Sequence, residues 1–173
     1  MTDHDQDSAD DQMLRQFLQY QRQSVLHIVD GLSEEAWHRP LFPTSWTPAG
    51  MVEHLGGAEW HWFQGVVSGK SPSLPADVDP DAAPYDPRTV VFDTEASSKE
   101  VVEFYRSQCA ESDAVLDVTP LSSVPRGQHR GGQGDVPNVR WVVLHMIEET
   151  ARHAGHLDIA RELIDGQVRR GAR

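Results

Sequence analysis

Hydrophobic residues recur every three or four positions along four separate stretches of the chain, and this spacing predicts four amphipathic helices. The first begins at Gln12 and ends near Leu32. The second begins at Thr47-Pro48, where a hydroxyl cap precedes a proline at the first helical position, and it ends near Val67.

The other two helices carry end signals of their own. The third begins after Ser97, which can form a capping box with Glu100, and it ends near Val118. The fourth is the longest, with Asn138 as its cap and Gly166 as its stop signal. Each helix therefore has local support at its ends in addition to the periodicity.

Two long connections separate the last three helices. Residues 68–93 contain five of the eleven prolines, and residues 119–137 contain three prolines and four glycines, so neither is expected to form regular structure. Strand-like alternation occurs only over residues 89–92. Four long amphipathic helices without competing strands predict an all-α fold, a four-helix bundle over residues 12–166 with two long irregular loops.

Composition narrows the classes of function. The chain has 27 acidic and 15 basic residues and a formal net charge of −12, which argues against nucleic-acid and membrane-surface partners. No apolar run approaches the ~18 residues of a membrane span, and the acidic N-terminus lacks the features of a signal peptide, so we expect a cytoplasmic protein.

Residues 1–11 should form a disordered acidic tail and residues 167–173 a basic tail. The single cysteine, Cys109, excludes an internal disulfide and any zinc site with two or more cysteines.

The fourth helix separates charged from apolar residues. At about 100° per residue, its solvent face holds Arg140, Glu148, Arg152, Gly155, Asp158 and Glu162, and its core face holds Val143, Ile147, Ala154, Leu157 and Ile164. Between them lies an otherwise apolar stripe that also carries His145, Glu149, His153 and His156.

Glu149 needs a partner, because an isolated carboxylate on an apolar stripe is costly or held protonated. His153 lies four residues on, one turn along the same face. The two side chains can bind one metal ion from a single helix, or they can satisfy each other by a hydrogen bond without metal. The additional histidines and the bundle architecture, whose core commonly hosts metal sites, favour the metal.

A third ligand has to come from another helix. The second helix offers His54, on or beside its buried face, and His61, which lies seven residues later in almost the same direction. His61 is therefore the rival of His54 as the ligand. Glu53 and Gln64 should lie roughly opposite, away from the core.

Other polar residues are candidates for supporting roles. His61, His145 and His156 could line a pocket or orient a ligating side chain. Arg126 and Arg130 form a basic spot in the loop 119–137, which either is simply solvated or holds a carboxylate of the substrate or cosubstrate. The remaining histidines lack such surroundings and are interpreted as ordinary: His4, His27, His38 and His129.

Two of these segments resemble a known family. Residues 47–55 (TPAGMVEHL) are similar to the second-helix motif of DinB-like proteins, and residues 148–158 (EETARHAGHLD) to the fourth-helix motif. The nearest branch is that of mycothiol-dependent maleylpyruvate isomerase and its single-domain relatives. The resemblance implies a divalent metal, usually zinc, held by His54, Glu149 and His153, and it also implies a homodimer.

Three functions fit this ligand set. Two histidines and a carboxylate leave a coordination position open, as in catalytic rather than structural zinc sites. The resemblance favours a metal-dependent enzyme that activates a low-molecular-weight thiol such as mycothiol, for transfer to, or isomerisation of, a small electrophilic substrate. The alternatives are a non-catalytic metal- or small-molecule-binding protein with a stress or resistance role, and a metal-dependent hydrolase. Nickel or another divalent ion is the alternative to zinc. Cys109 is not expected to be the nucleophile, because buried thiols are usually inert.

Overall fold

The computed structural model describes residues 9–70, 92–129 and 136–168. These residues form helices and irregular connections, and no strand is present among them. The helices are α1 (Ala9–Val29), α2 (Glu34–Trp37), α3 (Pro48–Glu59), the π-helix η1 (Trp60–Val67), α4 (Ser98–Asp117) and α5 (Val139–Asp165). The predicted all-α bundle is confirmed, with α3 and η1 together forming its second long helix.

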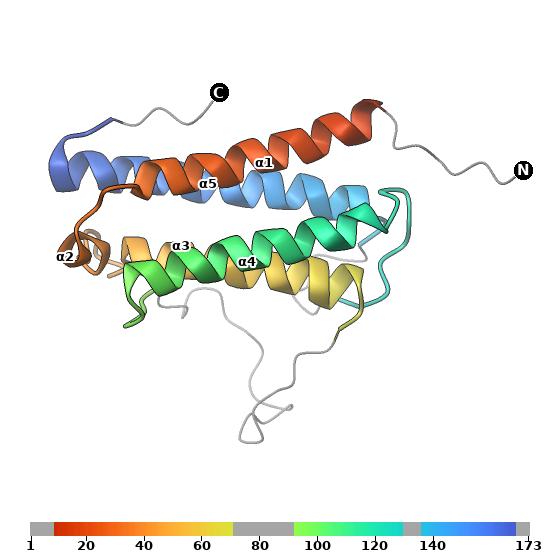
Figure 1. The fold of residues 1–173 in the computed structure, drawn as a ribbon, viewed down its shortest axis with the longest axis horizontal. Coiled ribbons are helices and arrows are strands. Elements are labelled where there is room, and N and C mark those ends of the chain that lie inside the picture. The colour runs from red at the N-terminus through yellow and green to blue at the C-terminus, as the bar shows by residue number, and fades with distance from the viewer. Residues whose placement is uncertain (1–8, 71–91, 130–135, 169–173) are drawn as a thin grey trace, which may run out of the picture.

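The long helices lie in two layers (Figure 1). One layer contains α1 and α5, and the other contains α3 and α4. Since α3 and α4 run in the same direction, the connection from Val67 to Ser98 has to span the length of the bundle, which requires a long linker. The connection from Asp117 to Val139 joins neighbouring helix ends.

The helix caps form as the sequence indicates. Thr47 accepts a hydrogen bond from the Gly50 amide, and Asn138 caps α5 through the Trp141 amide. Ser97 begins α4 with a complete capping box, and Gly166 ends α5 in the left-handed conformation at φ +72°.

Two elements differ from the expectation. The first helix begins at Ala9 instead of Gln12, and Asp11, expected in the tail, is buried and paired with Arg140 of α5. The second long helix changes from α to π at Trp60. A π-helix has wider turns than an α-helix, so the directions of residues 60–67 depart from the α-helical spacing. Gln64, expected to face away from the core, is consequently buried and donates a hydrogen bond to the Glu111 carbonyl.

A buried ion pair joins three helices in the core. Arg22 of α1 donates two hydrogen bonds to Glu59 at the end of α3, at 2.7 and 2.6 Å, and one of 2.6 Å to Asp113 of α4. The side chains of Arg22 and Glu59 are only 3% and 0% exposed. Burial alone would lower the pKa of Arg22, but the charge and hydrogen bonds of Glu59 outweigh it and raise that pKa.

None of the described helices has an apolar stretch long enough to cross a membrane.

Candidate metal centre

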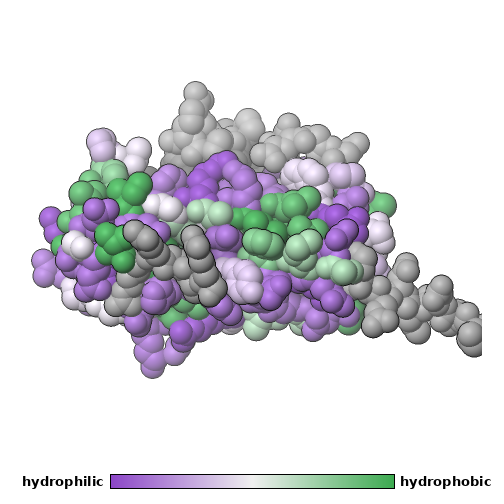
Figure 2. Space-filling view, turned by 90° about the horizontal axis from the view of Figure 1, so that it is seen from above, coloured by the Kyte–Doolittle hydropathy of each residue, from purple (hydrophilic) through white to green (hydrophobic). Residues whose placement is uncertain are grey.

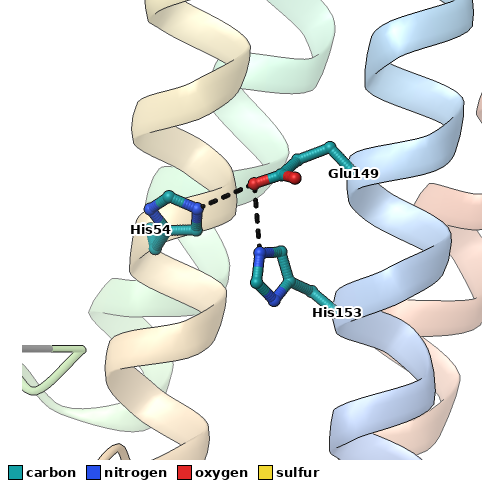
Figure 3. Close-up of side chains that lie close together, drawn as sticks. All are labelled: His54, Glu149 and His153. Carbon is teal, nitrogen blue, oxygen red and sulfur yellow. Dashed lines mark hydrogen bonds and ion pairs between the residues drawn. The ribbon is translucent and has the colours of Figure 1, made fainter. Parts of the chain in front are cut away.

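The site lies between α3 and α5, one helix from each layer (Figure 1). His54 stands in the middle of α3, and Glu149 and His153 stand one turn apart on α5. All three side chains point into the space between the two helices, where the imidazoles face the carboxylate (Figure 3). The predicted partner of Glu149 on α5 is therefore joined by a residue from the other layer.

The donor atoms of these three residues converge. The Nε2 atoms of His54 and His153 lie 3.2 and 3.0 Å from Oε1 of Glu149. One ligand atom from each residue can be chosen so that all three lie within 4.8 Å of one another. Neighbouring donors in a tetrahedral zinc site lie about 3.3 Å apart, because each bond is about 2.0–2.1 Å long. The residues present therefore fit a divalent metal in their chemistry and in their spacing.

The carboxylate is ionised in this arrangement. Hydrogen bonds from His153 and His54 hold the pKa of Glu149 well below its usual range, against the opposing effect of its burial. The two imidazoles supply the partners that the sequence analysis required for Glu149. The same contacts would satisfy the carboxylate without a metal. The geometry therefore fits a bound metal ion and also fits direct hydrogen bonds between Glu149 and the two histidines.

Further rings enclose the ligand histidines. Nδ1 of His156 lies 3.4 Å from Nδ1 of His153, the ring nitrogen that faces away from Glu149. His156 in turn contacts Trp46, with ring centroids 6.2 Å apart. The ring of His156 therefore lies beside the ring of His153, and its role in orienting that ligand stays a prediction.

A second group of rings lies along α5 toward its N-terminus. His61 and His129 approach with 3.0 Å between Nε2 and Nδ1. Trp62 stacks on His129 at 4.5 Å and contacts His145 at 4.4 Å, and Trp141 stacks on His145 at 5.3 Å. Burial lowers the pKa of all three histidines, and neighbouring imidazoles add to the effect for His61 and His129. The rings are therefore neutral near pH 7 and can share a hydrogen bond instead of repelling each other.

The contacts of this second group distinguish His61 from His54, the other candidate metal ligand on the second long helix. Among the described residues, His54, Glu149 and His153 form the group of three whose ligand atoms converge, and His61 is not part of it. His61 instead contacts His129, which the sequence analysis treated as ordinary. His129 lies in a loop without helical spacing, so no signal in the sequence connected it with His61.

The structure describes one of the two loop arginines, Arg126, and it does not belong to the group of His54, Glu149 and His153. The backbone amide of Arg126 donates to the Val67 carbonyl at 3.1 Å, which fastens the loop to the end of η1. Its side chain lines a cavity of about 330 Å³ between η1 and α4, together with Lys70 and Glu111. Arg130 is outside the described residues.

The only cysteine of the chain is not an activated thiol. Burial, followed by the nearby Glu59 charge, raises the pKa of Cys109 to about 12. Cys109 lies in α4, and the two elements that carry the trio are α3 and α5. A sulfur nucleophile at this site would have to come from a separate molecule.

Comparisons with known proteins address the resemblance seen in the two helix motifs. A search of curated proteins gives no match. The family model described as mycothiol-S-transferase matches residues 13–166, which include all four long helices nearly in full. The chain therefore belongs to the mycothiol-S-transferase family, which is one of the DinB-like families.

Proposed function

We propose that this protein is a divalent-metal-dependent transferase that activates a low-molecular-weight thiol of the mycothiol type and joins it to a small electrophile. The convergence of His54, Glu149 and His153 carries the proposal, because two imidazoles and one carboxylate leave a coordination position open. The family supplies the thiol and the transferase class. Zinc is the proposed ion, since it is commonly bound by histidine and carboxylate ligands at this spacing.

The residues have distinct roles in this scheme. A bound divalent ion would stabilise a thiolate at neutral pH. Glu149 supplies a negative charge to the ligand set, and His156 holds the ring of His153 in place. In the reaction the thiol loses its proton to solvent, and its sulfur forms a C–S bond with the electrophilic carbon. The leaving group departs with the bonding electron pair; an isomerisation would instead require a later loss of the thiol.

The deciding experiment measures metal content and thiol dependence together. Purified protein is analysed for zinc and nickel, and turnover of an alkyl halide is followed with and without added mycothiol. Turnover that needs both the ion and the thiol supports the proposal. Hydrolysis without thiol would support the hydrolase alternative, and stoichiometric metal binding without turnover would support a binding protein. Alanine at Cys109 is the control and should leave activity unchanged.

We also propose that two copies of the chain associate through an apolar helix face. Figure 2 looks onto the layer of α1 and α5 and shows apolar side chains gathered on that face. The exposed large apolar residues of these two helices are Met13, Phe17, Leu144, Ile159 and Leu163. Light scattering at micromolar concentration tests the association, and a monomer would contradict it.

A further inference from the structure

An irregular segment after the long linker is fastened firmly beside the metal centre. The Phe92 carbonyl accepts a hydrogen bond of 2.9 Å from the amide of Thr47, the residue that caps α3. The hydroxyl of Thr47 donates to Asp93 at 3.2 Å, and the hydroxyl of Thr94 donates to Glu53 at 3.1 Å. Residues 92–94 therefore keep a fixed position on the first two turns of α3 without belonging to a helix.

Gly50 permits this close approach. A Cβ atom at Gly50 would lie 2.1 Å from the carbonyl carbon and oxygen of Phe92, and 2.3 Å from the amide nitrogen of Asp93. These are backbone atoms, so a larger residue at position 50 would push the segment away from α3. Gly50 is one helical turn before His54, and the backbone of Phe92 is thereby fixed relative to a candidate ligand.

The ring of Phe92 contacts both candidate ligand histidines. Its centroid lies 4.4 Å from the His54 ring at 62°, and 6.0 Å from the His153 ring at 65°. Phe92 is a partly buried residue and packs against the core cluster of the bundle. It thus contacts the two imidazoles without being fully enclosed by the bundle.

The surroundings of the trio differ along α5. His145 lies one turn to the N-terminal side of Glu149 and belongs to the group of imidazole and indole rings around Trp62. Phe92 contacts His153, one turn to the C-terminal side of Glu149. Among the rings that contact the two candidate ligand histidines, Phe92 is thus a hydrocarbon ring that touches both, whereas His156 touches His153 as a polar imidazole.

We propose that Phe92 is a specificity-determining residue, the apolar wall of the metal centre, which selects a molecule carrying an apolar group next to its metal-binding atom. This inference rests on the proposed function, because it requires a ligand that binds at the ion. Removing about 50–60 Å² of apolar surface from water corresponds to about 10-fold in affinity. The ring should provide a preference of that size.

The test uses the protein loaded with Co²⁺ in place of the native ion and two thiols as probes. Phenylmethanethiol carries an apolar ring, and 2-mercaptoethanol carries a hydroxyl. Each is titrated while the sulfur-to-cobalt charge-transfer absorption is recorded, which measures binding without turnover. Phe92→Ala should weaken phenylmethanethiol binding about 10-fold, and should leave 2-mercaptoethanol binding and Co²⁺ affinity unchanged. Phe92→Leu should restore part of the preference.

Two further variants test whether the effect on thiol binding is specific to the Phe92 ring or follows from any loss of packing in the bundle. Phe104→Ala is the matched control, because Phe104 packs against α3 at Gly56 from α4 and makes no ring contact with His54 or His153 among the described contacts. It should leave both thiols unaffected. Gly50→Ala should reproduce the selective loss with the phenyl ring still present, provided that circular dichroism shows a folded helical protein.

Several results would overturn the inference. Equal weakening of both thiols by Phe92→Ala, or no weakening of either, would show that the ring does not select the ligand. Loss of Co²⁺ from Phe92→Ala would make the residue a support for the ligand histidines instead. A wild-type protein that binds Co²⁺ but neither thiol would refute the proposed function, and the wall as a thiol selector with it.

Discussion

Glu59→Gln should destabilise the fold more than most single substitutions in this chain. The change removes the charge that two hydrogen bonds connect to Arg22, in a position where both side chains are almost fully buried. Arg22 cannot lose its proton to compensate, because arginine stays charged in proteins. It keeps one bond to Asp113, whose side chain is 42% exposed. A buried positive charge would then be only partly compensated.

The expected size follows from this geometry. Breaking a buried ion pair by removing one partner costs about 3–5 kcal/mol. Glutamine keeps one oxygen that can accept from Arg22, and Asp113 remains, so we expect the lower end, about 3 kcal/mol. In a chain of this size, that loss lowers the melting temperature by about 6–12 °C.

The assay is urea unfolding followed by circular dichroism, with thermal melts in parallel. Glu148→Gln is the matched control, because it breaks the Glu148–Arg152 pair, whose side chains are 53% and 57% exposed. The control should cost only about 0.3–0.5 kcal/mol. The double variant Arg22→Met/Glu59→Met should lose less stability than the sum of its single changes, because it leaves no uncompensated charge in the pair.

Two outcomes would refute the reasoning. If Glu59→Gln costs no more than the control, the buried pair does not hold the charges that its geometry indicates. A loss that grows further in the double variant would show that shape and packing, and not charge, decide the stability at this place. Either result would remove the ion pair as the link between α1, α3 and α4.

The other predictions concern the site and its surroundings. The three candidate ligands are His54, Glu149 and His153, and alanine at any one of them should lower zinc affinity by at least about 10-fold in a competition titration. His61→Ala should not lower it. The pKa values of His61 and His129 are lowered, so in the range below about pH 6.5 the folded form binds fewer protons than the unfolded form. The contribution of these two histidines to the free energy of unfolding is therefore fully present above about pH 6.5. It is lost as the pH falls through their lower folded-state pKa values. His129→Gln should therefore flatten the dependence of that free energy on pH between about 7.5 and 5, and an unchanged slope would contradict the lowered pKa. Cys109 should resist a thiol reagent at about pH 8, because its pKa is raised to about 12, and should react on unfolding; rapid labelling of the native protein would contradict its burial.

Much of the fold is readable in the sequence because its signals are local. Hydroxyl and amide caps act within three residues, and a glycine stop acts at the helix end itself, so the starts of α3, α4 and α5 and the end of α5 follow from short segments. The pairing of Glu149 with His153 is also local, since residues four apart share one face of a helix. These are the features that the sequence determines by itself.

The tertiary structure decides the remaining questions, because they depend on packing between distant segments. His54 and His61 point in almost the same direction by α-helical spacing, and the packing of α3 on α5, with the change of pitch at Trp60, separates them. Phe92 reaches the trio through backbone contacts with Gly50, 42 positions earlier in the chain, which no periodicity records. Helix spacing fixes directions around one axis; it fixes neither the distance nor the rotation between two axes, and a shared site requires both.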